Sequence, residues 1–180
     1  MNTDRIRDYK IFMKRVIVKE INIVPKGETV VRKAELKDVS GIVDMVNIHV
    51  GTGDLLPRTE GDIIETLNDW VVADKGGKIV AIGSLLMYSD VLAEVRSLAV
   101  SATVRGEGIG YKIVSELKEE GKRRKVERLF ALTRAVNFFQ RQGFTITDKE
   151  NFPQKVYNDC EMCPLKENCD ETAVVLPLEY

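Results

Sequence analysis

Hydrophobic residues follow two different periods along this chain, and the period changes several times. In residues 38–50 and 109–121 apolar side chains recur every third or fourth position, which is typical of helices with one buried face. Elsewhere the apolar residues form short runs rich in Val, Ile, Phe and Thr, which favour strands. These runs predict strands at residues 29–34, 70–73, 79–88, 94–100, 127–133, 144–147 and 172–178.

Two shorter helices complete the pattern. Thr59, followed by Asp62, marks a helix start, and residues 135–142 form a helix that ends at Gly143. The resulting order of elements is β–α–α–β–β–β–α–β–α–β with a closing strand. This order predicts an α/β (α+β) fold, with a mixed, mostly antiparallel sheet flanked by helices.

The first residues of the chain read differently from the rest. Residues 1–14 are mixed and polar, which fits either a helix or an unstructured leader, and residues 16–24 favour extended structure. We therefore expect an N-terminal extension over residues 1–28, followed by one domain over residues 29–180 that ends in a cysteine-containing segment.

Composition narrows the class of partner. The net charge is −1, from 27 basic and 28 acidic residues, which gives no electrostatic case for binding nucleic acid or an anionic membrane. No apolar run approaches the roughly 20 residues that span a bilayer, and the charged N-terminus lacks the apolar core of a signal peptide. We expect a cytoplasmic protein with a small-molecule substrate, and we leave a homodimer open.

The strand at residues 94–100 runs into a glycine-rich loop, and the loop opens a helix. Gly106, Gly108 and Gly110 allow a sharp turn and a close approach to a ligand, because they have no Cβ. A helix N-terminus also presents unpaired N–H groups and the positive end of the helix dipole. The pattern fits a phosphate site, with a tight turn that binds nothing as the alternative. No Gly-Lys-Ser/Thr follows, so a Walker loop is excluded.

The arrangement Arg105-x-x-Gly108-x-Gly110 resembles the pyrophosphate loop of the GNAT N-acetyltransferases, and residues 96–100 resemble the strand that enters it. The resemblance covers residues 29–150. It implies the acyl-CoA N-acyltransferase fold and acetyl-CoA as co-substrate. The cofactor-binding positions that it implies are Leu98, Ala99, Val100, Arg105, Gly106, Glu107, Gly108, Ile109 and Gly110.

Acetyl transfer to an amine needs a base for the amine and a proton for the leaving thiol. Glu94 is the candidate base, because it is a carboxylate in an otherwise apolar strand and burial would raise its pKa. A solvent-facing residue, or one ion-paired with Arg96, is the alternative. By alternation Glu94, Arg96 and Leu98 share one face of the strand, unless a bulge intervenes.

The proton donor departs from the family pattern. Many GNAT enzymes carry a Tyr that protonates the thiolate, and here Phe139 stands at that position, between Phe138 and Gly143-Phe144. The role then passes to Thr133, which we take as the candidate, or to Ser97 or water.

Further motifs resemble the acetyltransferase domain of N-acetylglutamate synthases, in the short form without a kinase domain. They are Leu55-Leu56-Pro57-Arg58, residues 93–100, Phe130-Ala131-Leu132-Thr133 and the tail from Phe152 to Glu171. The resemblance implies direct acetylation of L-glutamate, the first step of arginine biosynthesis, with Arg58, Ser97 and Lys155 binding the substrate. Arginine suits a carboxylate because it can bind both oxygens.

Two alternatives remain open for the function. One keeps the fold and acetyl-CoA but changes the acceptor to another amino acid, a small amine or a protein N-terminus. The other, from a different class, is a non-catalytic acyl-CoA-binding sensor that reads metal or redox state through the cysteines.

The chain has three cysteines, Cys160, Cys163 and Cys169. An odd number argues against a disulfide framework. Zinc prefers four ligands, which Asp159, Asp170 or His49 would have to complete. We therefore expect reduced structural thiols and no metal, with zinc as the alternative. His49, the only histidine, is expected at the surface or as a capping residue, with a base or a metal ligand as the alternative.

Overall fold

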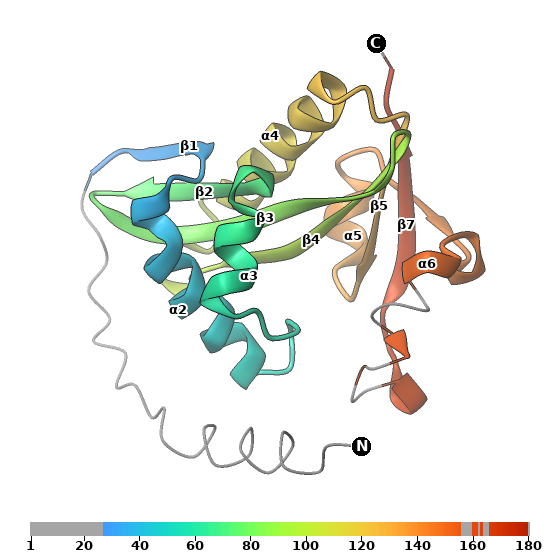
Figure 1. The fold of residues 1–180 in the computed structure, drawn as a ribbon, viewed down its shortest axis with the longest axis horizontal. Helices are drawn as coiled ribbons and strands as arrows, with labels where there is room; N and C mark the ends of the chain where they lie inside the picture. The colour runs from blue at the N-terminus through green and yellow to red at the C-terminus, as the bar shows by residue number, and fades with distance from the viewer. Residues whose placement is uncertain (1–26, 156–159, 162, 164–165, 180) are drawn as a thin grey trace.

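The computed structural model describes residues 27–155, 160–161, 163 and 166–179, apart from the side chain of residue 154 (Figure 1). The expected extension over residues 1–28 therefore lies almost entirely outside the described residues. The strands are β1 (Thr29–Lys33), β2 (Trp70–Lys75), β3 (Lys78–Ser89), β4 (Leu92–Val100), β5 (Arg128–Thr133), β6 (Thr145–Thr147) and β7 (Thr172–Pro177). The α-helices are α2 (Val39–Gly51), α3 (Glu60–Glu65), α4 (Ile109–Arg123), α5 (Val136–Gln140) and α6 (Pro153–Lys155).

The described strands form one seven-stranded sheet in the order β1-β2-β3-β4-β5-β7-β6. All neighbouring pairs are antiparallel except β4 and β5, which are parallel. The ladder between these two strands joins only Leu92–Glu94 to Arg128–Phe130. Beyond Glu94 the strands separate, so one edge of β4 has no partner strand along the stretch that leads to the glycine loop. The expected mixed, mostly antiparallel α/β architecture is confirmed.

Helices cover both faces of the sheet, and alternation along the strands assigns each residue to a face (Figure 1). On one face Val71 and Ala73 of β2 pack with Ile113 and Leu117 of α4. On the opposite face Trp70 and Val72 pack with residues of α2 and α3. The polar side chains that alternate with these core residues are therefore held at fixed positions. No helix in the described part of the chain is long and apolar enough to cross a membrane.

A β-bulge interrupts β4 at its centre. Ile82 pairs with Ala99 and Ser84 pairs with Arg96, so Gly83 faces two residues of β4, Ser97 and Leu98. Ser97 has a φ of 53°, a left-handed conformation that non-glycine residues rarely adopt. Side chains beyond the bulge exchange faces: Leu98 and Val100 pack on the α4 side with Val95, while Ala99 packs with α2. Leu98 therefore does not share a face with Glu94 and Arg96, which is the exception that a bulge creates.

Gly83 is required on the opposite strand for a packing reason. A Cβ built on Gly83 would lie 2.7 Å from Cγ2 of Ile113 and 3.1 Å from Cδ1 of Leu117. The helix α4 therefore lies directly against the β3 backbone at the bulge. This close approach fixes the start of α4, and with it the glycine loop, relative to β4.

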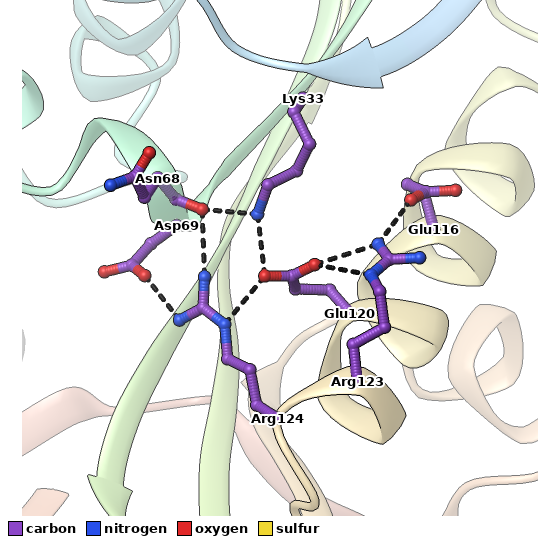
Figure 2. A network of polar contacts seen from close by, with 7 residues as sticks. All are labelled: Lys33, Asn68, Asp69, Glu116, Glu120, Arg123 and Arg124. Carbon is purple, nitrogen blue, oxygen red and sulfur yellow. Dashed lines mark hydrogen bonds and ion pairs between the residues drawn. The ribbon is translucent and has the colours of Figure 1, made fainter.

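A polar network joins the other end of α4 to β1 and to the segment before β2 (Figure 2). It comprises Lys33, Asn68, Asp69, Glu116, Glu120, Arg123 and Arg124. Its centre is Glu120, which is 9% exposed and lies 2.8 Å from Lys33 Nζ. The Nε groups of Arg123 and Arg124 donate to its two carboxylate oxygens at 2.9 and 2.7 Å. Burial alone would raise the pKa of Glu120, but these partners outweigh it and lower the pKa from 4.5 to about 2.

This network predicts an acid-sensitive contribution to folding. Because the pKa of Glu120 is lower in the folded protein, its contribution is complete above pH 4.5 and is lost as the pH falls towards 2. We expect Glu120→Gln to cost on the order of 1–3 kcal/mol at pH 7 and nothing near pH 2. Urea unfolding across this range measures the difference. Glu119→Gln, which changes an exposed pair with Lys122, should have little effect at either pH.

Candidate active site

The glycine loop has the backbone that an anion site needs. Gly106 and Gly108 have φ values of 88° and 73°, and Gly108 is the residue before the first turn of α4. A Cβ at either glycine would meet no atom within 4 Å, so the space in front of the loop is open to a ligand. The loop is tied to the sheet by an ion pair of 2.8 Å between Lys75 and Glu107. These features fit the pyrophosphate of acetyl-CoA bound by backbone N–H groups at the start of α4.

We expect Gly108→Val to reduce CoA affinity by about tenfold or more, since hydrogen bonds to a charged group contribute about 1.5–3 kcal/mol. The branched side chain enters the open space in front of the loop, and the positive φ strains the backbone by about 1–3 kcal/mol. Calorimetric titration with CoA measures the affinity. Gly77→Val is the matched control for strain, because Gly77 also has a positive φ, 83°, and open space around it. Equal CoA affinity in both variants would remove the loop from the site.

Glu94 lies where β4 and β5 separate, and it is only 2% exposed. Its Oε1 forms an ion pair of 2.7 Å with Nζ of Lys155, and its Oε2 accepts a hydrogen bond of 3.2 Å from the hydroxyl of Tyr88. The pairing of Leu86 with Glu94 across the β3–β4 hairpin brings Tyr88 close to the carboxylate. The sequence alternative of an ion-paired Glu94 is therefore correct in kind, but the partner is Lys155 rather than Arg96.

Lys155 reaches Glu94 because an aromatic stack holds the segment before it. Phe152, 2% exposed, lies parallel to Phe130 of β5, with ring centroids 4.0 Å apart. Phe130 also contacts the ring of Tyr88 at 5.5 Å. The stack buries Lys155 to 7% exposure, so its charge depends on Glu94 for compensation. The candidate base and one candidate substrate-binding residue are thus partners in one ion pair.

Two arginines gather on the α3 side of the site. Arg58 and Arg96 both lie close enough to Asp62 to lower the pKa of its carboxyl, after the larger effect of hydrogen bonds from Thr59. Thr59 and Asp62 also form the expected capping box of α3, with the Asp62 N–H donating to the Thr59 hydroxyl at 3.1 Å. This cap fixes the backbone beside Arg58. Arg96 was considered only as a partner for Glu94, and alternation along β4 places it on the same face as that carboxylate.

The guanidinium of Arg58 is poorly satisfied by the protein. Its Nε is buried and has no hydrogen-bond partner among the described residues. Its Nη1 donates only to the carbonyl of Pro57, at 3.3 Å. Buried donors are nearly always paired, so this guanidinium is suited to receive an anionic group from a ligand.

Thr133, the candidate acid, lies at the end of β5 and is 9% exposed. Its Oγ1 accepts a hydrogen bond of 2.9 Å from the Ala135 N–H, which leaves the hydroxyl proton available for donation. Ser97 is also 9% exposed, on the β4 bulge. Phe139 lies in the core against Phe144, with ring centroids 5.1 Å apart, so its position offers no acid.

Arg134 was not identified from the sequence, yet it connects two loops near the site. Its Nε donates to Asp170 at 2.6 Å, before β7, and its Nη1 donates to the carbonyl of Gly53 at 3.2 Å, in the loop before α3. Next to Asp170, Glu171 has its pKa raised by burial, against the opposing charges of Arg134 and Lys155. Only the fold brings these residues together, since they are distant in sequence.

The remaining candidates differ from expectation in two ways. His49 is 9% exposed rather than at the surface, and its Nδ1 lies 3.6 Å from Asp54. It lines a hollow of about 200 Å³ with Ser101 and Arg105. The cysteines are free thiols: Cys160, Cys163 and Cys169. Among the residues with described positions, no group of three His, Cys, Asp or Glu side chains is arranged to hold a metal ion, so zinc is unsupported.

Comparison with known proteins identifies the family. Residues 50–144, more than half of the chain, match the family described as "Acetyltransferase (GNAT) family". The chain belongs to the GNAT acetyltransferases. An uncharacterized N-acetyltransferase of Chlorobaculum tepidum is 40% identical over 86% of this chain and all of its own length. An amino-acid acetyltransferase of Mycobacterium tuberculosis is 35% identical over 74% of this chain and 77% of its own length.

Solved GNAT structures agree with the fold described above. A Mycobacterium tuberculosis protein in complex with CoA has a TM-score of 0.73 at 28% identity, over 83% of this GNAT chain and 99% of that chain. N-acetylglutamate synthase from Neisseria gonorrhoeae, complexed with CoA and N-acetyl-glutamate, has a TM-score of 0.75 at 19% identity. That similarity covers 86% of this chain and 36% of the synthase, and it concerns the fold alone. The expected GNAT fold is confirmed, and CoA is the ligand of both neighbours.

Proposed function

We propose that this acetyltransferase moves the acetyl group of acetyl-CoA to the α-amino group of L-glutamate, the first step of arginine biosynthesis. The observation that carries the proposal is the pair of arginines, Arg58 and Arg96, on the Glu94 face of the sheet beside Asp62. A substrate with two carboxylates needs charge-assisted donors, and two guanidinium groups supply them. The amino-acid acetyltransferase names of relatives support the same substrate class.

In the proposed reaction the substrate nitrogen attacks the thioester carbonyl carbon, a C–N bond forms and the C–S bond breaks. Glu94, directly or through a water, accepts the proton that the amine must lose. Its pair with Lys155 keeps the carboxylate ionised and therefore able to accept a proton. Thr133, Ser97 or water returns a proton to the CoA thiolate. No covalent intermediate with the enzyme is needed, so no cysteine takes part.

An acetyl-CoA-dependent thiol-release assay across the twenty amino acids tests this proposal. We expect L-glutamate to have the highest kcat/KM, with D-glutamate and L-glutamine as controls for stereochemistry and for the second charge. Preference for leucine, alanine or another uncharged acceptor would replace glutamate while keeping the acetyltransferase. Tight CoA binding without turnover of any amine would instead favour an acyl-CoA sensor.

A further inference from the structure

A cationic hollow lies beside the first turns of α4, separate from the residues at Glu94. It is open and has a volume of about 480 Å³. Its lining comes from α4 and from the segment that follows α5: Tyr111, Lys112, Ser115, Lys118, Arg141 and Gln142. This lining contains three cationic side chains and no carboxylate. The hollow is therefore suited to an anionic ligand.

The charges in this hollow are not neutralised by the protein. Lys112, Lys118 and Arg141 form no ion pair with the described acidic residues. Lys118 instead donates to the carbonyl of Gln142 at 2.5 Å. Burial, with a smaller contribution from the charge of Lys122, lowers the pKa of Lys118. A bound anion would relieve this cost, which a surface built only for solvation would not incur.

Arg141 is oriented with two donors left over. Its Nε donates to the hydroxyl of Tyr111 at 2.8 Å. The Tyr111 ring is fixed in turn by an edge contact with Phe138, at a centroid distance of 5.1 Å. Neither Nη group of Arg141 donates to a described residue. Two parallel donors on a fixed guanidinium match two oxygens of a phosphate.

The position of the hollow indicates which phosphate. Tyr111 and Lys112 follow directly after the glycine loop, in the first turn of α4, which begins at Ile109. A CoA molecule with its pyrophosphate at this loop has its adenosine, and the 3′-phosphate on that adenosine, immediately beyond the pyrophosphate. We propose that the hollow binds this 3′-phosphoadenosine end, with Lys112 and Arg141 as the 3′-phosphate ligands and Lys118 as the flanking charge. The proposal rests on acetyl-CoA as the co-substrate of the proposed function.

Calorimetric titrations with CoA and with dephospho-CoA, which lacks only the 3′-phosphate, test the assignment. We expect the wild-type protein to bind CoA at least about tenfold more tightly than dephospho-CoA, since charge-assisted contacts of this kind contribute about 1.5–3 kcal/mol. Both Lys112 and Arg141 are exposed, so Lys112→Ala/Arg141→Ala should fold normally. In that variant the two ligands should bind with equal affinity, because dephospho-CoA never used the deleted charges.

Arg128→Ala is the matched control, because it removes an exposed arginine near the opposite end of α4. It should leave the CoA to dephospho-CoA ratio unchanged. Equal binding of the two ligands by the wild-type protein overturns the proposal, and so does an equal loss for both ligands in the double variant. Inorganic phosphate that binds the hollow without competing with CoA would assign it to a separate anion and overturn it too. These results use no amine acceptor, so they are independent of whether glutamate is the substrate; absence of CoA binding would overturn both proposals.

Discussion

Glu94→Gln should lower kcat by about 100- to 10,000-fold, the usual contribution of a general base. The substitution keeps the shape of the side chain and removes its basicity. It also leaves the buried Lys155 ammonium without its carboxylate at 2.7 Å, which costs about 3–5 kcal/mol of stability when a buried pair is broken. Rates must therefore be measured below the unfolding temperature of the variant, under conditions where chemistry limits turnover. A kcat within a few-fold of wild type would make Glu94 a structural residue.

Tyr88→Phe is the matched control for this variant. It keeps the ring contact with Phe130 and removes only the hydroxyl that donates to Glu94 at 3.2 Å. If Glu94 acts as the base, losing one donor raises its basicity slightly, and we expect a small upward shift of the acidic limb of the pH–rate profile. A merely structural Glu94 would lose some stability in Tyr88→Phe with no change in that profile.

Lys155→Met separates two roles for the lysine. If Lys155 holds a substrate carboxylate, as the family resemblance implies, the variant should raise the KM for glutamate. If Lys155 only keeps Glu94 ionised, the variant should change kcat and its pH dependence with little change in KM. The buried position of Lys155 beside Phe152 makes Met, a flexible apolar side chain, the replacement that disturbs packing least.

Local patterns predicted most of the fold because the signals are local. The Gly-Gly turn between β2 and β3, the capping box at Thr59 and the apolar stripe of α4 each depend on residues a few positions apart. The β4 bulge could not be predicted, because it depends on the close approach of α4 to Gly83 across the sheet.

The candidate site divides in the same way. The glycine loop and Glu94 stand out in one continuous stretch of sequence, whereas the partners of Glu94 do not. Tyr88 could have been found by pairing residues across the predicted β3–β4 hairpin, which places it near Glu94. Lys155 required the stack of Phe152 on Phe130, a contact between segments that are distant in the chain. The burial of His49 is equally non-local, because residues after β4 line the hollow beside it.

Arg58→Ala should raise the KM for glutamate by about 30-fold or more and leave CoA affinity nearly unchanged. Losing one partner of a charge pair in a partly dry pocket costs about 2–5 kcal/mol. Arg58 has a buried Nε with no partner among the described residues, so the substrate carboxylate is the group expected to satisfy it. Arg58→Lys should recover only part of the loss, because an ammonium lacks the planar fork of donors.

Two measurements decide whether the Arg58 effect concerns substrate charge. Wild-type preference for glutamate over glutamine should shrink in Arg58→Ala, because glutamine never offered the second carboxylate. Glu60→Ala, an exposed change two residues away on α3, should alter neither KM nor that preference. An Arg58→Ala variant that keeps the wild-type KM and preference would leave Arg96 as the remaining candidate for the acceptor carboxylate. A uniform loss for both amino acids would instead mean that Arg58 shapes the pocket through the capping box at Thr59.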